Sequence, residues 1–495
     1  MFDTLEKRLS RKDLLVSAGY IGGQWVDVRQ AEEEDRKTFS VKDPATGDVI
    51  ATLPDLGVGG AKAAIESAFI AQQEWKTRTG KERASVLRKL HDLMIEHADD
   101  LAAILTAEMG KPFAEAKGEI LYGASYVEWF AEEAKRIYGD VIPGHQADKR
   151  IVVIKQPVGV VASITPWNFP NAMMTRKLAP ALAAGCAFVA KPAAETPLSA
   201  LAMARLAEEA GVPAGLFSVI PSADAKAIGE EFCSNDKVRK LSFTGSTEVG
   251  RILMKQSADK VLRTSMELGG NAPFIVFNDA DLDAAVEGAM ISKYRNNGQT
   301  CVCANRIYVQ SGVYDAFSEK LTAAVQKMRV GNGFDEAINA GPLISSEALA
   351  KVEDHIADAA SKGAHIVTGG KRHQLGGTFF EPTILTGVTK AMKIAKEETF
   401  GPVAPLFSFE TVEDVIEQAN DTIFGLASYF YARDMAQVWR VAEALEYGMV
   451  GINTGLISTE VAPFGGIKQS GQGREGSKYG LEDYLEIKYL CMGGV

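Results

Sequence analysis

Short apolar runs separated by amphipathic segments mark the middle of the chain. The segment LSALAMARLAEEAG at 198–211 has apolar residues at helical spacing, and Gly211 and Pro213 follow the usual order of a helix end. Strands that alternate with helices of this length predict an α/β fold built on a doubly wound parallel sheet. The runs that we interpret as its strands are 158–164, 187–190, 216–220, 240–243 and 264–268.

Two predicted strands end in polar loops that suit a nucleotide, because doubly wound sheets bind ligands at the carboxyl ends of their strands. Residues 244–246, Thr-Gly-Ser, form a turn that opens a helix, and the first N–H groups of that helix suit a phosphate. A plain serine cap is the alternative. Lys191 ends another strand, where it would reach a ribose or phosphate oxygen unless it is an ordinary solvated lysine. Together the two loops predict a nucleotide site.

A third segment imitates a nucleotide motif. Residues 471–476, GQGREG, match the pattern G-x-G-x-x-G, but no predicted strand leads into them. Only nineteen residues follow, which is too few for a further strand–helix–strand unit. We therefore interpret 471–476 as a loop and expect the nucleotide to bind elsewhere.

Composition narrows the range of partners. The 495 residues are enough for two or three domains. With 64 acidic and 53 basic residues the net charge is −11, which disfavours binding to a nucleic-acid backbone. No stretch is long and apolar enough to span a membrane, and the N-terminal sequence lacks the apolar core of a signal peptide. We expect a cytoplasmic protein with neither nucleic acid nor membrane as a partner.

The cysteines and histidines are few. Five cysteines are too few for a disulfide framework, and six scattered histidines form no cluster typical of a metal site, so no metal is expected. Cys301 and Cys303 lie in GQTCVCANR, a loop after a helix that is predicted to end near Gly298. A cysteine nucleophile needs a base. Because no histidine falls in a motif-like segment, a carboxylate is the remaining candidate.

Six motifs are spread along the chain: TPWNFP, FTGSTEVGR, ELGGNAP, GQTCVCANR, EETFGPV and PFGGIKQSG. From about residue 20 to its end, the chain resembles the aldehyde dehydrogenase superfamily in their order and spacing. The segments TRK at 175–177, YRNNGQTCVCANR and GLIS at 455–458, with the C-terminal GREGSKYGLEDYLEIKYLCMGG, resemble succinate-semialdehyde dehydrogenases. The resemblance implies oxidation of succinate semialdehyde to the dicarboxylate, with glutarate semialdehyde as the alternative substrate.

The resemblance implies catalytic roles for three residues. Cys301 would attack the aldehyde as a thiolate, and the side-chain amide of Asn168 would bind the oxyanion of the thiohemiacetal. Glu267 would activate the water that hydrolyses the resulting thioester. Without the resemblance, Asn168 would be interpreted as a turn residue and Glu267 as a surface acid. Cys303 would be either a small packing residue or the partner of Cys301 in a reversible redox disulfide.

The resemblance also implies a site for NADP or NAD. Glu398 would hold the nicotinamide ribose and Phe400 would pack beside the nicotinamide, although a solvated acid and a core aromatic are the ordinary alternatives. NAD-preferring relatives carry at the position of Ala194 a glutamate that bonds the 2′-hydroxyl of the adenosine ribose, whereas here Glu195 comes one residue later. We therefore expect NADP to be preferred, with Lys191 pairing with its 2′-phosphate, and NAD to be a usable alternative. The implied cofactor-binding residues are Thr165, Pro166, Trp167, Lys191, Ala194, Gly229, Gly245, Ser246, Leu268, Glu398 and Phe400.

The distal carboxylate of such a substrate needs a cation, and a bidentate arginine suits it. The resemblance maps this role onto Arg176 and Arg295, helped by the hydroxyl of Ser458, whereas surface salt bridges are the ordinary alternative for both arginines. Two alternative functions are those of a nucleotide-binding structural protein that has lost catalysis and of a dehydrogenase that passes the acyl group to CoA. The intact catalytic set speaks against the first, and Glu267 speaks against the second.

The resemblance implies three parts. Residues 1–139 and 159–267 would form a dinucleotide-binding domain, 268–475 an α/β catalytic domain, and 140–158 with 476–495 a β oligomerisation arm. The arm sequence RIVVIKQPVGVV would be an exposed apolar edge strand unless a partner covered it. The resemblance therefore implies a homodimer or a homotetramer.

Overall fold

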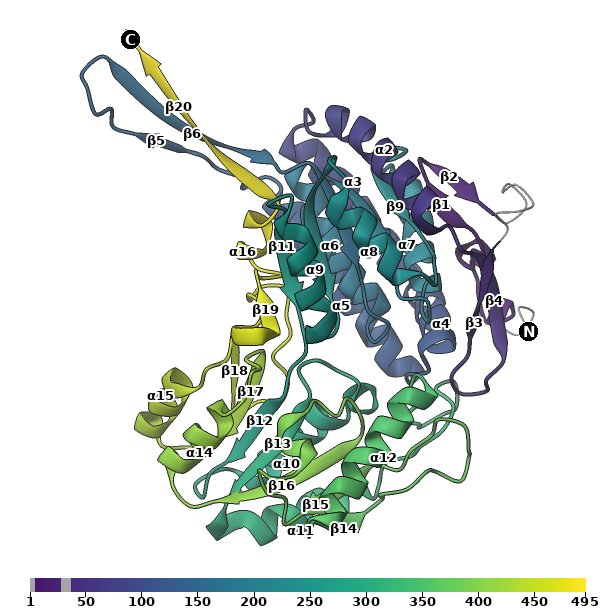
Figure 1. Cartoon of the computed structure of the whole chain (residues 1–495), viewed down its shortest axis with the longest axis vertical. Helices are drawn as coiled ribbons and strands as arrows, with labels where there is room; N and C mark the ends of the chain where they lie inside the picture. Colours follow the sequence, from purple (N-terminus) through teal and green to yellow (C-terminus); the bar gives the residue numbers. More distant parts are fainter. Residues whose placement is uncertain (1–4, 28–36) are drawn as a thin grey trace.

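The computed structural model describes residues 5–27 and 37–495, and it shows two lobes with an arm that projects from the upper one (Figure 1). Residues 1–4 and 28–36 of the expected dinucleotide-binding domain lie outside the described residues. The upper lobe contains an eight-stranded sheet in which β11, β10, β7, β8 and β9 run parallel. Across the sheet the strands are β19 (Gly471–Gln472), β11 (Arg263–Glu267), β10 (Val238–Thr244), β7 (Val160–Ile164), β8 (Ala187–Lys191), β9 (Phe217–Val219), β1 (Gly19–Ile21) and β2 (Gln24–Val26).

Helices surround this sheet, and several begin and end at residues that suit helix termini. The side chains and backbones of Thr79 and Glu82 form a reciprocal capping box at the start of α3, and Pro170 occupies the first turn of α6. Gly185 ends α6 and Gly211 ends α7, both in the left-handed conformation. The helices are α2 (Gly57–Trp75), α3 (Gly80–Glu96), α4 (Ala98–Met109), α5 (Phe113–Glu133), α6 (Pro170–Ala184), α7 (Leu198–Ala210), α8 (Ala225–Ser234) and α9 (Thr247–Ala258), after the short 3-10 helix η1 (Lys12–Leu14).

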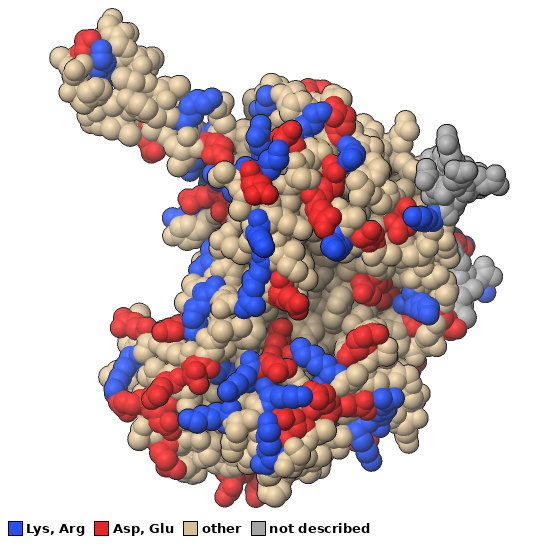
Figure 2. Space-filling view, viewed as in Figure 1, with Lys and Arg blue, Asp and Glu red and all other residues tan. Residues whose placement is uncertain are grey.

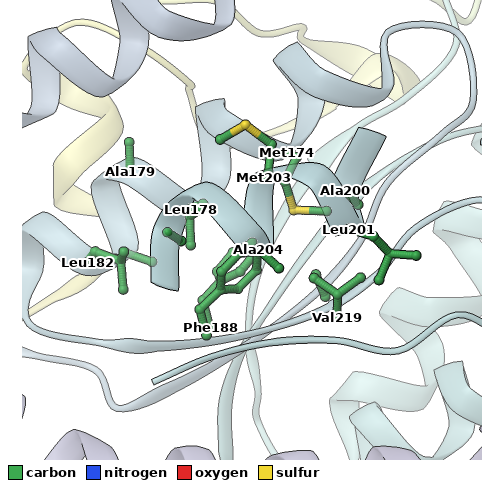
Figure 3. Close-up of a cluster of buried hydrophobic side chains, with 14 of the residues drawn as sticks. Met174, Leu178, Ala179, Leu182, Phe188, Ala200, Leu201, Met203, Ala204 and Val219 are labelled. Atoms are coloured by element: carbon green, nitrogen blue, oxygen red, sulfur yellow. The ribbon is translucent and has the colours of Figure 1, made fainter. Parts of the chain in front are cut away.

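The core of the upper lobe lies between these helices and the sheet. Figure 3 shows Leu178 and Leu182 of α6 and Met203 of α7 gathered around Phe188 of β8. All four side chains are fully buried. Burying one such side chain stabilises the fold by about 1.5–3 kcal/mol, so this cluster fixes α6, which follows Asn168 and carries Arg176.

The lower lobe is built on a mixed seven-stranded sheet. Its strands, in order, are β14 (His365–Thr368), β15 (Thr383–Thr386), β16 (Val403–Phe409), β13 (Ala304–Gln310), β12 (Ala272–Val276), β17 (Ala427–Tyr431) and β18 (Met449–Ile452). All neighbours are parallel except β14 and β15. Its helices are α10 (Leu282–Tyr294), α11 (Tyr314–Val325), α12 (Ser346–Ser361), α13 (Lys393–Lys396), α14 (Val412–Asn420) and α15 (Met435–Ala444), with 3-10 turns η4 (Arg295–Gly298), η5 (Ser311–Val313) and η6 (Lys468–Ser470).

The arm is a three-stranded antiparallel sheet in the order β20 (Leu485–Gly493), β6 (Lys149–Pro157) and β5 (Asp140–Ile142). The expectation that RIVVIKQPVGVV is an exposed edge strand is wrong, because β6 is the central strand and β20 of the same chain pairs along its whole length. The two edges of this sheet are β20, where Ile487 and Tyr489 are largely accessible, and the short strand β5, where Val141 is largely accessible. A short helix, α16 (Tyr479–Glu482), precedes β20, and a separate hairpin is formed by β3 (Thr38–Lys42) and β4 (Val49–Pro54).

The predicted α/β fold with a parallel sheet is confirmed. Each of the five predicted strand runs overlaps one of the parallel strands β7 to β11, and the helix predicted before Gly211 is α7. The interpretation of 471–476 as a loop is wrong in part, because Gly471 and Gln472 form β19 and pair with the end of β11. This edge strand brings the residues after it next to the end of β11.

Three properties of the structure bear on possible partners: surface charge, membrane-spanning helices and metal ligands. Figure 2 shows acidic and basic side chains intermixed over both lobes on this face, with a hollow between the lobes. Among the described residues, no helix is long and apolar enough to cross a membrane. Within the same residues, no group of three or more His, Cys, Asp or Glu side chains is placed to hold a metal ion.

Candidate active site

Three residues from separate strands converge where the two lobes meet. Asn168 follows β7, Glu267 ends β11, and Cys301 lies in the loop before β13. β7 and β11 run in the same direction, so their carboxyl ends lie at one edge of the upper sheet. The link from β11 to β12 touches the cysteine loop directly, because a Cβ atom on Gly270 would overlap the carbonyl oxygen of Cys301.

Asn168 is tied to the cysteine loop on both its backbone and its side chain. It is only 5% exposed, and its Nδ2 donates to the carbonyl oxygen of Gln299 at 3.1 Å. Its own carbonyl oxygen accepts hydrogen bonds from Lys111 Nζ at 2.7 Å and from Asn296 Nδ2 at 3.0 Å. The Oδ1 atom has no hydrogen-bond partner among the described residues. The amide is therefore held against the segment that leads to Cys301.

The loop before Cys301 has an unusual backbone. Asn296 and Asn297 both adopt the left-handed conformation, with φ of 51° and 54°, which asparagine tolerates better than most residues. The N–H of Asn296 donates to the carboxylate of Glu115 at 2.7 Å, and Asn297 Nδ2 donates to the carbonyl oxygen of Gly341 at 2.8 Å. The sequence Arg-Asn-Asn-Gly thus shapes the turn that presents the cysteine.

The thiol of Cys301 lies among two cations and two carboxyl groups. Burial raises its pKa to about 12, and Arg176 and Arg295 act in the opposite direction. Glu398 and Glu267 are close enough to raise the pKa further. At neutral pH the resting group is therefore the protonated thiol, and a nucleophilic attack requires the proton to leave as the sulfur reacts.

Glu267 is a buried carboxyl and not a surface acid. It is 3% exposed, and neither carboxylate oxygen has a hydrogen-bond partner within the described part of the chain. Burial raises its pKa well above the usual range, and the negative charge of Glu475 adds to this effect. Arg176 and Lys177 partly offset the rise. A buried carboxyl whose oxygens are free for other contacts is suited to proton transfer.

Glu475 is a site residue that the sequence did not reveal. It forms buried ion pairs with Lys177 and with Arg176, whose Nη2 lies 2.6 Å from Glu475 Oε2. Burial alone would raise its pKa, but Lys177 and Arg176 hold the pKa below the usual range. Glu475 lies in GQGREG, three residues after β19, and it is brought here by the pairing of β19 with β11 and by its own backbone hydrogen bonds with Phe464. No local pattern distinguishes it from an ordinary loop acid.

The two expected substrate arginines both lie close enough to the Cys301 thiol to lower its pKa. Arg176, on α6, is 1% exposed and its guanidinium lies 3.9 Å from the ring centre of Phe464. Its Nε has no acceptor among the described residues. Arg295 is half-buried, lies 5.2 Å from the ring centre of Phe169, and forms no ion pair with any described carboxylate. Neither arginine therefore forms an ordinary salt bridge on the surface.

Ser458 is half-buried in the loop after β18. Within the described residues it forms no hydrogen bond to either arginine, so the structure does not join it to them. The next residue is closer to the site: the Tyr126 hydroxyl donates to the carbonyl oxygen of Thr459 at 3.2 Å, and the Tyr126 ring lies 5.5 Å from the guanidinium of Arg176.

The expected nicotinamide end contains a pair of aromatic rings. Trp167 and Phe400 meet edge to face, with ring centres 5.5 Å apart. Phe400 has a positive φ of 55°, which is rare for an aromatic residue and indicates that its position is fixed by its surroundings. Burial raises the pKa of Glu398 to about 7, and its Oε1 accepts the N–H of Gly270 at 3.0 Å. Thr165 and Pro166 directly precede Trp167, and Leu268 directly follows β11.

The turn after β10 opens α9 as predicted. Ser246 caps the helix, because its Oγ accepts the N–H of Val249 at 3.3 Å. Thr244 Oγ1 is buried without a hydrogen-bond partner among the described residues, and Gly245 follows it at the helix start. Gly229 brings α8 close to α9, since a Cβ atom there would lie 3.2 Å from a Leu253 methyl group.

Lys191 is buried at the end of β8 and is not a solvated lysine. Burial lowers its pKa, and the carboxylates of Glu195, Asp55 and Asp224 oppose that shift. Ala194 and Glu195 line a cavity of about 670 Å³ that reaches the hairpin β3–β4. The cation expected to meet a 2′-phosphate thus lies among several acids.

Comparison with known proteins decides the family. A sequence model described as "Aldehyde dehydrogenase family" matches residues 30–490. The chain belongs to the aldehyde dehydrogenase family. It is 64% identical over 488 residues to glutarate-semialdehyde dehydrogenase of Pseudomonas aeruginosa, covering 99% of this chain and 100% of the relative. It is 62% identical over 486 residues to succinate-semialdehyde dehydrogenase [NADP(+)] GabD of Escherichia coli, covering 98% and 100%.

The fold of this aldehyde dehydrogenase is shared with solved structures. The crystal structure of succinate-semialdehyde dehydrogenase from Burkholderia pseudomallei matches with a TM-score of 0.96 and 62% identity, covering 98% of this chain and 99% of that one. The matches confirm the expected family, the expected fold and the expected enzyme class, an NAD(P)-dependent aldehyde dehydrogenase.

The residues at the nucleotide end of the dehydrogenase fit such a cofactor. The unpaired Thr244 hydroxyl beside the start of α9 suits a phosphate oxygen, since helix N-termini favour anions. Lys191 supplies a buried ammonium, and the carboxyl of Glu398 keeps Oε2 for a ribose hydroxyl while Oε1 binds Gly270. The ring pair of Trp167 and Phe400 offers an apolar wall.

Cys303 occupies a different environment from Cys301, although both are free thiols. It is fully buried, its Sγ accepts a hydrogen bond from Lys293 Nζ at 3.3 Å, and its thiol lies 3.4 Å from the carbonyl oxygen of Lys293. Burial raises its pKa and Lys293 opposes the rise. The same ammonium donates to Asn305 Oδ1 at 3.1 Å. Cys303 is therefore packed against a buried lysine.

Proposed function

We propose that this dehydrogenase oxidises a dicarboxylic semialdehyde with NAD(P)+, and that succinate semialdehyde is its preferred substrate. The observation that carries the proposal is Arg295, a half-buried arginine without an ion-pair partner among the described residues, close enough to Cys301 to lower the pKa of its thiol. Arg176 acts on the same thiol from α6. An aldehyde whose far end is a carboxylate supplies the missing anion, and Ser458 adds a hydroxyl to its binding.

The chemistry falls to three residues. The Cys301 thiol gives its proton to Glu267, from which it passes to solvent, and the sulfur bonds to the aldehyde carbon. The resulting oxyanion accepts hydrogen bonds from Asn168 Nδ2 and the Cys301 N–H. NAD(P)+, held by the residues at the nucleotide end, would supply the hydride acceptor that converts this adduct to a thioester on Cys301. Glu267 takes a proton from water as the water oxygen attacks the thioester, the carbon–sulfur bond breaks, and the dicarboxylate leaves. If peroxide oxidises the Cys301 thiol to a sulfenic acid, the Cys303 thiol would condense with it to a disulfide and release water.

Glutarate semialdehyde is the second candidate substrate, and the relative from Pseudomonas aeruginosa favours it, because its 64% identity slightly exceeds that of the succinate enzyme from Escherichia coli. One methylene changes the binding of a substrate by only about 1–3 kcal/mol, so both aldehydes would be turned over. The residue Glu267 argues against transfer of the acyl group to CoA and against a silent structural protein.

NADP is proposed as the preferred cofactor. Ala194 offers neither an acceptor for a 2′-hydroxyl nor a charge that repels a 2′-phosphate. Lys191 would pair with that phosphate, but Glu195, Asp55 and Asp224 reduce its pull. The expected preference is therefore modest, and NAD is used as well.

The arrangement of the chain suggests where and how the enzyme works. We expect it in the cytoplasm as a homodimer or homotetramer assembled through an arm of residues 140–158 and 476–495. Residues 1–139 and 159–267 would act as the dinucleotide-binding domain, and 268–475 as the catalytic domain. The exposed edge of β20 is available for contact with a second copy.

The test is a steady-state panel of succinate semialdehyde, glutarate semialdehyde and butanal, each with NADP+ and NAD+. We expect kcat/KM to be highest for succinate semialdehyde with NADP+ and lowest for butanal. Arg295→Met should raise KM for both semialdehydes far more than for butanal, whose rate changes only through the lost effect of Arg295 on the Cys301 thiol. Equal rates for butanal would remove the arginine role, a higher value for glutarate semialdehyde would exchange the two substrates, and no turnover at all would favour the structural protein.

A further inference from the structure

A buried ion pair lies directly behind Asn168. Lys111, in the link between α4 and α5, is 2% exposed, and its Nζ lies 2.6 Å from Oε2 of Glu119 on α5. The same ammonium donates to the carbonyl oxygen of Asn168 at 2.7 Å and stands 3.7 Å from the ring centre of Phe169. Removing two charges from water costs several kcal/mol per ion, so this pair is an expensive way to hold a loop.

Glu119 is itself fixed at the start of α6. Its Oε1 accepts the backbone N–H groups of Asn171 at 3.0 Å and Ala172 at 3.2 Å, so the carboxylate caps the first turn of the helix that follows Asn168. Apart from the ion pair itself, the three hydrogen bonds of Lys111 and Glu119 therefore all go to the segment 168–172. The N–H of Asn296, whose side chain shares the Asn168 carbonyl, is held by Glu115, four residues before Glu119 on α5.

We propose that the Lys111–Glu119 pair is a positioning device for the oxyanion donor, which sets the direction of the Asn168 amide without touching the substrate. The inference rests on the proposed role of Asn168. A carbonyl oxygen held by an ammonium fixes the plane of the Asn168–Phe169 peptide, and with it the backbone from which the side chain projects. The side-chain amide makes one hydrogen bond, to the Gln299 carbonyl, and its Oδ1 makes none among the described residues, so its own contacts hold it weakly.

The charged groups around Lys111 agree with this role. Burial lowers the pKa of Lys111, while Glu119 and Glu115 oppose the shift and Arg295 adds to it. The centre of the Phe169 ring lies 3.7 Å from Lys111 Nζ and 5.2 Å from the Arg295 guanidinium, so one ring contacts both cations. The pair thus aligns the oxyanion donor next to the arginine proposed to bind the carboxylate of the substrate.

The experiment removes the pair without leaving a buried charge. In Lys111→Met with Glu119→Gln, the glutamine oxygen still accepts the N–H groups of α6. We expect kcat to fall by about 10- to 100-fold, as for a catalytic group displaced by about 1 Å, with the dissociation constant for NADP+ unchanged. The matched control is Lys117→Met. Lys117 lies on α5, as Glu119 does, and forms an exposed ion pair with Asp99 of α4 at 2.8 Å, so its loss should leave kcat unchanged.

A thermodynamic cycle with Asn168→Ala separates positioning from a general structural effect. Asn168→Ala alone should lower kcat by about 10²–10³-fold, and adding the double substitution should lower it no further, since the pair acts only through the amide. Losses that multiply would overturn the positioning role. If Asn168→Ala retains full activity, the proposed role of Asn168 fails instead.

Folding is checked by thermal melting of each variant. Should the double variant not fold, Glu119→Gln alone is the substitute, and it should lower kcat by about 3- to 10-fold with an unchanged KM for the cofactor. The separate conservative variant Lys111→Arg keeps the hydrogen-bond donor and the charge. It should therefore retain most of the wild-type kcat. Wild-type kcat in a folded Glu119→Gln or double variant would refute the proposal.

Discussion

The two ends of the candidate site use buried polar groups in opposite ways. Around Cys301, both oxygens of Glu267, Oδ1 of Asn168 and Nε of Arg176 have no hydrogen-bond partner in the described part of the chain. At the nucleotide end Ser246 caps a helix and Glu398 binds a backbone N–H, and Thr244 Oγ1 is the exception. The partnerless groups around Cys301 make no hydrogen bond that stabilises the fold. At the nucleotide end, Ser246 and Glu398 do form such hydrogen bonds.

This difference separates chemistry from architecture. A buried polar group without a partner costs about 1–3 kcal/mol, so several of them in one place indicate a function that repays the loss of stability. Substitutions of the groups without a partner at the Cys301 end should therefore remove rate and spare the fold. Substitutions at the nucleotide end should change affinity, and those that remove a structural bond should also change stability.

The largest expected effect comes from removing the sulfur. Cys301→Ala should lower the rate of aldehyde oxidation by about 10³-fold or more, because Cys303, the other thiol of this loop, is fully buried against Lys293 and cannot take its place. The dissociation constant for NADP+, measured by fluorescence titration, should not change. Substantial residual turnover would remove Cys301 as the nucleophile, and lost NADP+ binding would show that the two ends are not separable.

The next effect concerns pH. Glu475→Gln removes a negative charge that raises the pKa of Glu267 and leaves Arg176 and Lys177 without their counter-ion. Both changes favour ionised Glu267, so its pKa falls, and a base that must be ionised remains active to lower pH. The acid limb of the kcat profile should move down by about one pH unit or more.

The same variant should lose stability, because two buried cations are left unpaired. Breaking a buried pair costs about 3–5 kcal/mol, which urea unfolding would detect. Lys117→Met serves as the control for loss of an exposed pair. An unmoved acid limb in a folded Glu475→Gln protein would show that Glu267 does not limit the rate at low pH.

At the nucleotide end, Ala194→Glu should move cofactor preference from NADP towards NAD. The new carboxylate would accept the 2′-hydroxyl and repel a 2′-phosphate beside the acids already near Lys191. The ratio of kcat/KM for NADP+ to that for NAD+ should fall about tenfold or more, as expected for like charges about 4 Å apart near a surface. The reciprocal control is Glu195→Gln, which should favour NADP. A constant ratio would place residue 194 away from the ribose.

The smallest effect on basal rate is expected at Cys303. Cys303→Ala should retain kcat within about twofold, since the side chain is packing behind the loop.

The redox role of Cys303 is tested by oxidation. Mild peroxide should inactivate wild type, dithiothreitol should restore its activity, and the oxidised protein should be lighter by two hydrogen atoms. The contact of Cys303 with Lys293 has to break for this disulfide to form. Equal recovery of the Ala variant would leave Cys303 with packing alone.

The parts of the fold that sequence could predict are those set by neighbours along the chain. The runs that became β7 to β11 and the helix end at Gly211 are written in local periodicity and capping. The order and spacing of the motifs were enough to predict the family and its candidate site residues. What the motifs do not contain is the set of charges that holds those residues in place.

The remaining features depend on distant pairings. Lys111 meets Asn168 across 57 positions, and Glu475 meets Lys177 across 298. The strand β6 was mistaken for an edge because its partner β20 lies at the far end of the chain. An acid in a glycine-rich loop and a lysine after a helix have many ordinary uses, and only tertiary structure shows which one applies.

The late position of Glu475 has a consequence for biosynthesis. A ribosome adds about 5–20 residues per second, so the 298 positions from Lys177 to Glu475 take about 15–60 s to translate. During that time the nascent chain carries Arg176 and Lys177 on α6 without the carboxylate that compensates them. β20 then has still to be made before the arm can close on β6. The pocket is thus electrically complete only after Glu475 has been added, and the growing enzyme remains inactive until then.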